Sequence, residues 1–404
     1  MNRGRYWQPK IDRLVRKART IYHGIPQWLR FVLAPLKFGY WLVDVLRPDL
    51  WVMTGEEVRS KQELTIIYAG ISENRHFIKK LAFHEGHREE HIGKTWLWSI
   101  SKASRSTDHK DALVITEVPR SFRLLFRQPM TWYVPCWVHG ELDISSDAES
   151  LFRSRSLRSD INKIKNAKLA LDVTDDDRDV FDFYHSMHLP FITQTHGDRA
   201  VAVDYELVKR ELRRCDLVFI TREEQRLAGA LVRYSKRRAE LWFLGIRDGN
   251  LEYVKQGVIG ALYYFPILYL QTKGIQRVDF GPSRAFLRNG VLQYKRKWNQ
   301  TLCRTSIVGF LIRPLVIGAA VKGFFCNNPF IVSDGKKLSG AIFVDEDEQL
   351  SQDYFARICK ERYFKGMSEL VVFRFGEVNN EMPHGVPSEL SGTIVVRSVE
   401  CDSK

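Results

Sequence analysis

The apolar and polar positions of residues 215–246 follow the pattern of an antiparallel meander. Three apolar runs occupy residues 215–220, 227–234 and 239–246, and short polar turns separate them. Turns of this length join antiparallel neighbours, because the chain has no room for a crossover between the strands. The sequence therefore predicts three consecutive strands in this stretch.

A helix and a fourth strand are predicted directly after the meander. Residues 247–250 interrupt the strand pattern, and the apolar residues that follow them recur at helical spacing. The apolar face of this helix is formed by Val258, Leu262, Phe265 and Tyr269. Pro266 predicts a kink, Gly274 ends the helix, and residues 277–281 are the next strand. A helix between neighbouring strands indicates an α/β or α+β sheet rather than a sandwich.

The first half of the chain shows a similar alternation. A strand is predicted at residues 64–70, and Ser72 is expected to cap the helix that follows it. Further strands are predicted at 95–100 and 112–118, and an aromatic extended run at 132–138. These elements predict a first α/β unit ahead of the one that contains the meander.

The chain is expected to be an α/β (α+β) protein with two units of mixed sheet flanked by helices. Its 404 residues are enough for two or three domains with sizeable cores. The expected parts are a helical segment at 1–50, a first unit at 51–150, a second unit at 151–300, strands and a helix that complete the core at 301–380, and a flexible tail at 381–404.

The N-terminal segment combines a basic amphipathic helix with an aromatic stretch. Residues 9–24 show the periodicity of an amphipathic helix. Residues 28–46 are largely apolar, but Arg30, Lys37 and Asp44 interrupt them and disfavour a membrane-spanning helix. Two interpretations stay open: the segment lies on an anionic membrane surface, or it packs as a helix pair on the protein's own body. Six scattered cysteines and the lack of a recognisable signal peptide indicate a cytoplasmic protein, with the inner membrane face as its peripheral location under the first interpretation.

The positive net charge of the chain indicates an anionic partner. The formal net charge is +14, which suits a phosphorylated cofactor, a nucleic acid or an anionic membrane. The basic residues cluster in 1–30, 153–168 and 284–304. Each cluster is equally compatible with an ordinary solvated face.

Three segments carry a resemblance to a known family. They are a basic helix at 156–167, a strand ending Asp279-Phe280-Gly281, and the closing run 290–298. The stretch 156–299, a little over a third of the chain, resembles the GNAT-like acyltransferase domain of the Fem-type peptidoglycan aminoacyl transferases and their bacterial relatives. The resemblance implies one or two GNAT-like units and transfer of an acyl group to an amine. The donor would be acetyl-CoA or another acyl-CoA, or an aminoacyl-tRNA in the Fem branch.

The donor's phosphates are expected at the start of the helix after the meander, since the first N–H groups of a helix are unpaired. The candidate cofactor-binding residues are Gly249, Asn250, Lys255 and Gln256, with Lys295 and Arg296 on the other side. The run 255–261 departs from the Gln/Arg-x-x-Gly-x-Gly/Ala phosphate loop usual in GNAT proteins. Acyl-CoA, an aminoacyl-tRNA and a catalytically inactive binding protein therefore all stay open.

Amine acylation needs a base and binding groups for both substrates. Candidate catalytic residues are Asp279 at the end of a strand, Tyr294 in the closing run, and His196 in a polar turn. Candidate substrate-binding residues are Arg158, Lys163, Tyr184, His188 and Arg284. A structural role is the alternative for each of them. Nucleotide- or lipid-linked sugars are candidate acceptors, because their phosphates would meet arginine and lysine and their sugars would stack on aromatic rings.

A metal site is the remaining possibility that the sequence raises. His84, His87 and His91 lie close together, and the last two would share a face if the segment were helical. The spacing is not that of an H-E-x-x-H motif, and charged neighbours suggest a solvated segment. We expect no metal cofactor.

Overall fold

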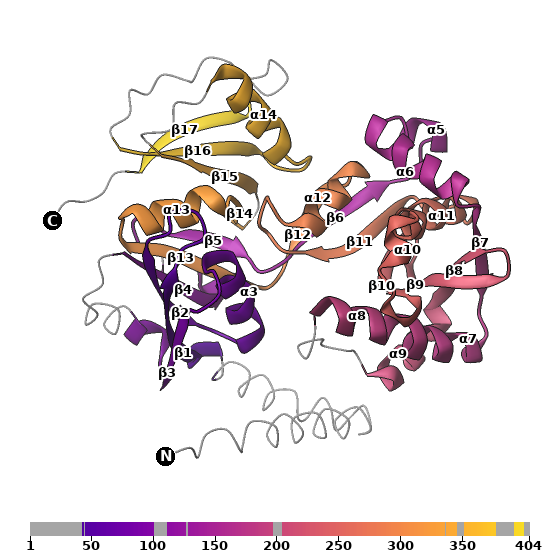
Figure 1. The fold of residues 1–404 in the computed structure, drawn as a ribbon, viewed down its shortest axis with the longest axis horizontal. Helices are drawn as coiled ribbons and strands as arrows, with labels where there is room; N and C mark the ends of the chain where they lie inside the picture. The colour runs from indigo at the N-terminus through magenta and orange to yellow at the C-terminus, as the bar shows by residue number, and fades with distance from the viewer. Residues whose placement is uncertain are drawn as a thin grey trace.

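The computed structural model describes residues 43, 45–100, 111–126, 128–196, 204–335, 337–345, 351–376 and 392–399. The N-terminal amphipathic helix and almost all of the aromatic stretch lie outside these residues. Within the described part of the chain, three mixed sheets flanked by helices form, which confirms the predicted α/β class (Figure 1). No helix of this part is long and apolar enough to cross a membrane.

The first sheet has six strands. In spatial order they are β3 (Arg88–Lys94), β1 (Asp49–Glu56), β2 (Glu63–Ala69), β4 (Ala112–Pro119), β13 (Val308–Val316) and β5 (Trp132–Pro135). Only β2 and β4 run parallel, and the connection between them contains the helix α3 (Ser72–Ala82) and the strand β3. Short 3-10 turns lie at Leu97–Ser99 and Arg120–Phe122.

The second sheet has seven strands. Their order is β12 (Thr301–Thr305), β6 (Val138–Asp143), β11 (Arg277–Ser283), β10 (Arg238–Ile246), β9 (Gln225–Ser235), β8 (Cys215–Arg222) and β7 (Leu169–Thr174). The predicted antiparallel meander is confirmed in β8, β9 and β10. Here too a single pair is parallel, β10 with β11, and the helix α11 (Val258–Thr272) connects the two.

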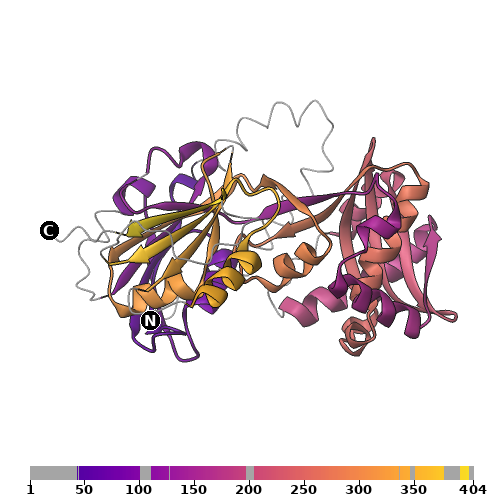
Figure 2. The ribbon, with the colours of Figure 1, turned by 90° about the horizontal axis from the view of Figure 1, so that it is seen from above.

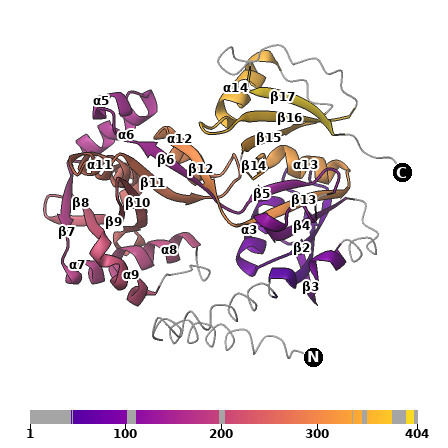
Figure 3. The same cartoon turned by 180° about the vertical axis from the view of Figure 1, so that it is seen from behind.

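Helices cover both faces of the second sheet (Figure 3). One face carries α11 with α5 (Ala148–Leu151), α6 (Arg155–Asn166) and α12 (Gly290–Lys297), and its core includes Ile161, Leu262 and Trp298. The other face is covered over β8 to β10 by α7 (Asp177–Asp182), a π-helical turn at Phe183–His188, α8 (Leu189–His196) and α9 (Tyr205–Glu211). Shorter turns lie at Leu212–Arg214, Arg247–Gly249 and α10 (Glu252–Lys255).

The third sheet has four strands and shares its core with the first. It consists of β14 (Phe330–Ser333), β15 (Leu338–Val344), β16 (Glu369–Phe375) and β17 (Ile394–Val399), with α14 (Gln352–Arg362) between β15 and β16. The helix α13 (Ala319–Asn327) lies between the first and third sheets (Figure 1). Aromatic side chains join the three layers: Phe343 of β15 contacts both Trp132 and Phe325, at ring-centroid distances of 5.3 and 4.7 Å.

The two larger sheets exchange strands (Figures 1 and 2). β5 and β6 follow each other in the chain, yet β5 lies in the first sheet and β6 in the second. Later in the chain β12 joins the second sheet, and β13 crosses back to pair with β4 and β5 of the first. Each larger sheet is therefore completed by a strand from the other half of the chain.

Several local expectations are wrong. The predicted strand at 95–100 contains a 3-10 turn instead. His91 lies in strand β3 rather than on a helix, so it cannot share a helix face with His87. Ser72 is the first residue of α3 and not its cap, which is Ile71 without a side-chain hydrogen bond. Residues 394–399, expected to belong to a flexible tail, form β17 and pair with β16.

Candidate functional site

A polar groove lies on the second sheet, on the face opposite α11. Val278 and Phe280 of β11 pack into the core beneath α11, so the residue between them, Asp279, points to the other face. The groove has a volume of 380 Å³. Its charged lining comes from β6, β9, β10, β11 and β12 and includes Glu141, Arg233, Glu240, Arg277 and Arg304.

The parallel pair β10–β11 separates at the floor of this groove. Only three positions are in register, and the last of them pairs Glu240 with Asp279. Two residues further on, Gly281 adopts a φ of +77°, a left-handed conformation that glycine takes without strain. The turn at Gly281 directs its N–H group back to the Asp279 carboxylate, at 2.8 Å. Ligand clefts of open sheets form where neighbouring strands diverge in this way.

The Asp279 carboxylate is almost fully buried but well satisfied. Besides the Gly281 N–H, it accepts a hydrogen bond from His139 Nδ1 at 3.1 Å and one from the guanidinium of Arg304. Burial alone would raise the pKa of Asp279, but the hydrogen bond and charge of His139, the Gly281 N–H and the charge of Arg304 hold it below its usual range. The carboxylate is therefore ionised at neutral pH and is a poor base itself.

His139 is the residue that this carboxylate orients. A carboxylate only accepts hydrogen bonds, so Nδ1 of His139 carries the proton and Nε2 of the neutral ring is an acceptor. The His139 side chain is 24% exposed, and its partner Asp279 lines the groove. A histidine held in one tautomer by a buried aspartate is the arrangement of a general base.

Sequence reasoning did not find His139. It lies on β6, 140 residues before Asp279, and reaches β11 only because β6 crosses into the second sheet. Nothing in the local sequence marks this exchange, since β6 reads as part of the first unit. Arg304 was missed as an individual residue, although it ends the third basic cluster.

Lys295 supports the site from below. Its side chain is buried, and Nζ donates to the carbonyl oxygens of Gly281 and Pro282 at 2.9 and 3.0 Å. Burial lowers the pKa of Lys295 to about 8, against an opposing effect of the Asp279 charge. Lys295 thus holds the turn that carries the Gly281 N–H, and it does not present its charge at the surface.

The residues of the expected phosphate site at 249–256 make separate structural contacts. Gly249 packs against α8, where a side chain would meet the Pro190 carbonyl oxygen. Asn250 accepts a hydrogen bond from the Glu252 N–H group at the start of α10, and Lys255 pairs with Glu252 in the same short helix. Gln256 accepts a hydrogen bond from Arg222. The long helix α11 starts only after Gly257, which has a φ of +91° and offers no side-chain cap.

Three further candidates lie on the side of the second sheet that α11 covers. Arg158 and Lys163 are exposed on α6, and Lys163 passes close to Gly257 at the start of α11. Tyr294 packs against Tyr263 in the core, where burial raises its pKa. These residues are therefore near one another but on the opposite face from Asp279.

The remaining candidates are structural contacts or stand apart. Tyr184 and His188 are buried beneath α8, and His188 Nδ1 bonds the Leu244 carbonyl oxygen at 2.8 Å. Arg284 joins the two larger sheets by donating to Asn74 at 2.6 Å. Arg296 donates to the carbonyl oxygens of Lys360 and Glu361 and so fixes α14 to α12. His196 is the last residue of α8.

Among the described residues, no group of three or more histidine, cysteine, aspartate or glutamate side chains is placed to hold a metal ion. The histidines at 84–91 have other partners. His87 bonds Glu89 at 3.0 Å, and His91 bonds Asp49 at 2.9 Å on the outer part of the first sheet.

No protein-family model matches the chain, and no curated protein sequence matches it. Several solved structures are similar. FemX is 10% identical over 66% of this chain and 84% of its own, with a TM-score of 0.35. L-PGS from Bacillus licheniformis is 10% identical over 65% and 80%, with a TM-score of 0.34. A GCN5-related N-acetyltransferase from Sphaerobacter thermophilus is 9% identical over 66% and 78%, with a TM-score of 0.31. These are the groups that the sequence resembles, and at this similarity the likeness concerns the fold alone.

Proposed function

We propose that the protein is an acyltransferase that acylates an amine in the groove of the second sheet. The observation that carries the proposal is the pair of His139 and Asp279 at the point where β10 and β11 separate. An amine must lose a proton to become a nucleophile and to complete the transfer, and an oriented histidine supplies a base for that proton.

The chemistry needs few groups. The amine nitrogen attacks the acyl carbonyl carbon, and the C–N bond forms while the bond to the donor's sulfur or oxygen breaks. Nε2 of His139 takes the proton from the nitrogen, and the Asp279 carboxylate stabilises the resulting imidazolium. Arg304 lies against Asp279 with half of its side chain exposed, so it brings positive charge to where the oxyanion develops. The imidazolium of His139 then returns this proton to the departing thiolate or alkoxide, which restores the neutral histidine.

An acyl-CoA is the donor that this proposal favours. The start of α11 suits an anionic group, because it has no side-chain cap and Lys163 passes beside it. The fit is partial, since the side chain of Asp160 approaches Gly260 in the first turn of the same helix. One phosphate of the donor would be held there by backbone N–H groups and Lys163. Because this point lies on the opposite face of the sheet from Asp279, the acyl arm would pass between the separated strands β10 and β11.

The acceptor is proposed to be an amine that also carries negative charge, such as an amino sugar linked to a nucleotide or lipid phosphate. Glu141 and Glu240 in the groove suit a protonated amine before transfer, and Arg233, Arg238 and Arg277 suit phosphate. Arg238 is paired with Glu141 at 3.3 Å, so an incoming phosphate would compete with that ion pair.

The test is a transfer assay with purified full-length protein, acyl-CoAs of different length and a panel of amino-sugar nucleotides. His139→Gln should lower the rate by roughly 10²–10⁴-fold, the usual contribution of a positioned base. His91→Gln is the matched control, because His91 also bonds an aspartate but lies on the first sheet. Equal rates for both variants would remove His139 from the mechanism. A thermal shift with bulk tRNA and none with any acyl-CoA would instead favour an aminoacyl-tRNA donor.

A further inference from the structure

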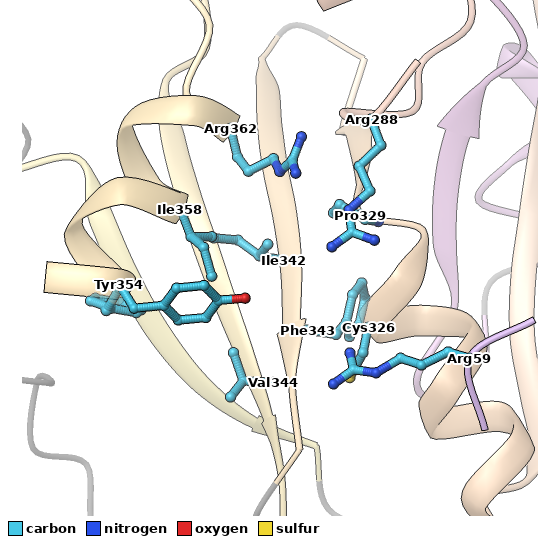
Figure 4. A pocket seen from close by; sticks show the side chains of 11 residues that line it. Arg59, Arg288, Cys326, Pro329, Ile342, Phe343, Val344, Tyr354, Ile358 and Arg362 are labelled. Atoms are coloured by element: carbon cyan, nitrogen blue, oxygen red, sulfur yellow. The ribbon is translucent and has the colours of Figure 1, made fainter. Parts of the chain in front are cut away.

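A second basic pocket lies in the other half of the molecule, between α14, β15 and the first sheet (Figure 4). Three arginines surround it: Arg59 from the turn between β1 and β2, Arg288 from the segment before α12, and Arg362 from the end of α14. Three segments far apart in the sequence therefore direct like charges toward one small volume.

The pocket combines this charge with apolar walls. Its floor is formed by Ile342 and Val344 of β15, with Ile358 and the ring of Tyr354 on the α14 side (Figure 4). Apolar walls lower the local dielectric constant, so a charge–charge interaction inside is stronger than at an open surface. The cavity measures 140 Å³, whereas pockets for whole cofactors or drug-sized ligands span about 300–1,000 Å³. Its size therefore suits one anionic group rather than a complete cofactor.

Two arginines of the pocket, Arg288 and Arg362, have neutral partners among the described residues. Arg288 donates to Asn327 Oδ1 at 2.5 Å, and Arg362 donates to the Leu287 carbonyl oxygen at 3.2 Å. Among the described residues, neither Arg288 nor Arg362 forms an ion pair with a carboxylate. Burial and the nearby charge of Arg288 lower the pKa of Arg362, while the neighbouring Glu361 acts in the opposite direction.

The first of the acidic residues that follow the floor of the pocket is engaged elsewhere. Asp345 comes directly after Val344, and it pairs with Lys322 of α13 at 3.4 Å. Among the described residues, the three guanidinium groups lie near one another without a carboxylate partner for Arg288 or Arg362. This arrangement is electrostatically unfavourable, and an anion between them removes that cost.

We propose that this pocket binds a phosphate ester, with the phosphate between the three arginines and the ester's organic group on Tyr354 and Ile358. A phosphate monoester carries up to two negative charges and several acceptor oxygens, and the planar guanidinium binds such a group through two parallel hydrogen bonds. A carboxylate would supply one charge and two oxygens, and so would satisfy three arginines less well. The pocket lies outside the groove of the second sheet, and the proposal does not depend on acyl transfer.

The same chemistry occurs in a soluble phosphate ester and in the headgroup of a phospholipid. The first arm of the test uses titration calorimetry of the full-length protein at low ionic strength with phenyl phosphate, inorganic phosphate and benzoate. We expect phenyl phosphate to bind most tightly, since it supplies both the phosphate and a ring for Tyr354. Benzoate binding as tightly as phenyl phosphate would overturn the phosphate assignment.

The variants are Arg288→Gln and Arg362→Gln, with Arg178→Gln on α7 as the charge-matched control. Each pocket variant should weaken phenyl phosphate binding by roughly ten-fold, and the control should bind as the wild type does. Binding that is absent in the wild type, or unchanged in both pocket variants, would overturn the proposal. If either pocket variant is unfolded by circular dichroism, Arg59→Gln replaces it, because Arg59 lies on an exposed turn.

The second arm measures sedimentation with vesicles of phosphatidylcholine, with and without phosphatidic acid, which carries a phosphate monoester. Binding that requires phosphatidic acid and is lost in the Arg288→Gln variant supports a lipid headgroup as the ligand. Phenyl phosphate binding without vesicle binding supports a soluble ester. Vesicle binding that survives in both pocket variants comes from another surface and, together with absent phenyl phosphate binding, contradicts the proposal.

Discussion

The two larger sheets place a carboxylate at corresponding points and use it in opposite ways. Each sheet has one parallel pair whose connection contains a helix. The connection between β2 and β4 of the first sheet contains α3 and β3, and the connection between β10 and β11 of the second contains α11. Glu117 follows the last parallel position of β4, and Asp279 occupies the last one of β11. The surroundings of the two carboxylates determine their roles.

In the first sheet the carboxylate of Glu117 has a structural role. Glu117 accepts hydrogen bonds from the Tyr68 hydroxyl and from the Ile71 N–H at the start of α3, 3.0 Å away. Burial raises the pKa of Glu117 to about 6, although these hydrogen bonds oppose the shift. The parallel pair keeps five positions in register, and the space beyond it is filled by the Glu117 side chain against Gly70.

In the second sheet the carboxylate faces a groove. The parallel pair stops after three positions, and Asp279 is bonded by His139 and Arg304, both of which reach solvent. A site thus requires more than a carboxylate between parallel strands. The strands must separate early, and the crossing strand β6 must supply a histidine.

The largest expected effect separates the two carboxylates by activity. Asp279→Asn should lower the transfer rate by roughly 10²–10⁴-fold, because the amide no longer holds His139 in the same tautomer with a negative charge behind it. Glu117→Gln keeps an acceptor for the Tyr68 hydroxyl and should leave the rate close to that of the wild type. Steady-state kinetics of both variants provide the measurement. A similar loss of transfer rate in both variants would contradict the separate roles of the two carboxylates.

The contributions of Glu117 and Asp279 to stability should depend on pH with opposite signs. The folded-state pKa of Glu117 is raised to about 6, so its contribution to stability is present below pH ~4.5 and is lost as the pH rises through 6. Between pH 4 and 7, the free energy of unfolding of Glu117→Gln should gain about 2 kcal/mol relative to the wild type. The pKa of Asp279 is lowered, so its contribution is present above its ordinary pKa and is lost only on acidification.

Urea unfolding at several pH values measures both effects. Asp279→Asn should lose stability relative to the wild type at neutral pH, and this difference should shrink as the pH falls below 4. If the free energy of unfolding depends on pH in the same way for the wild type and Glu117→Gln, burial does not raise the pKa of Glu117 and the prediction is wrong.

The smallest effect concerns a glycine beside each carboxylate. Gly281→Ala should cost roughly 1–2 kcal/mol, because an L-residue is strained at a φ of +77°, although the space beside it is open. Gly70→Ala should destabilise for a different reason, since its methyl group would collide with the Glu117 carboxylate. Shortening Glu117 to alanine should relieve the second cost and leave the first unchanged. Denaturation of the single and double variants tests this difference.

The local part of the fold could be predicted from the sequence. The meander, α11 and β11 follow from apolar spacing and turn residues, which act over a few positions. The strand at 95–100 failed because its aromatic residues suit a 3-10 turn equally well, and β17 was missed because it lies within a polar segment.

Only part of the candidate site could be proposed from the sequence. Asp279 could be proposed as a candidate because a polar residue at the end of an apolar strand is informative on its own. His139 could not, because its role depends on pairing between strands 140 residues apart. Lys295 was recognised as important, but its charge alone suggested an exposed phosphate ligand, whereas the structure places it in the interior with two carbonyl oxygens.

The strand exchange also has a consequence for biosynthesis. β4 and β5 of the first sheet are separated in space by β13, which follows β4 in the chain by about 190 residues. Ribosomes add about 5–20 residues per second, so the first sheet waits roughly 10–40 s for its missing strand. During that interval the edges of β4 and β5 have no native partner, and unpaired edges of this kind are where nascent chains associate with one another. A chain of this design is expected to depend on chaperones that hold its first half until the second has emerged.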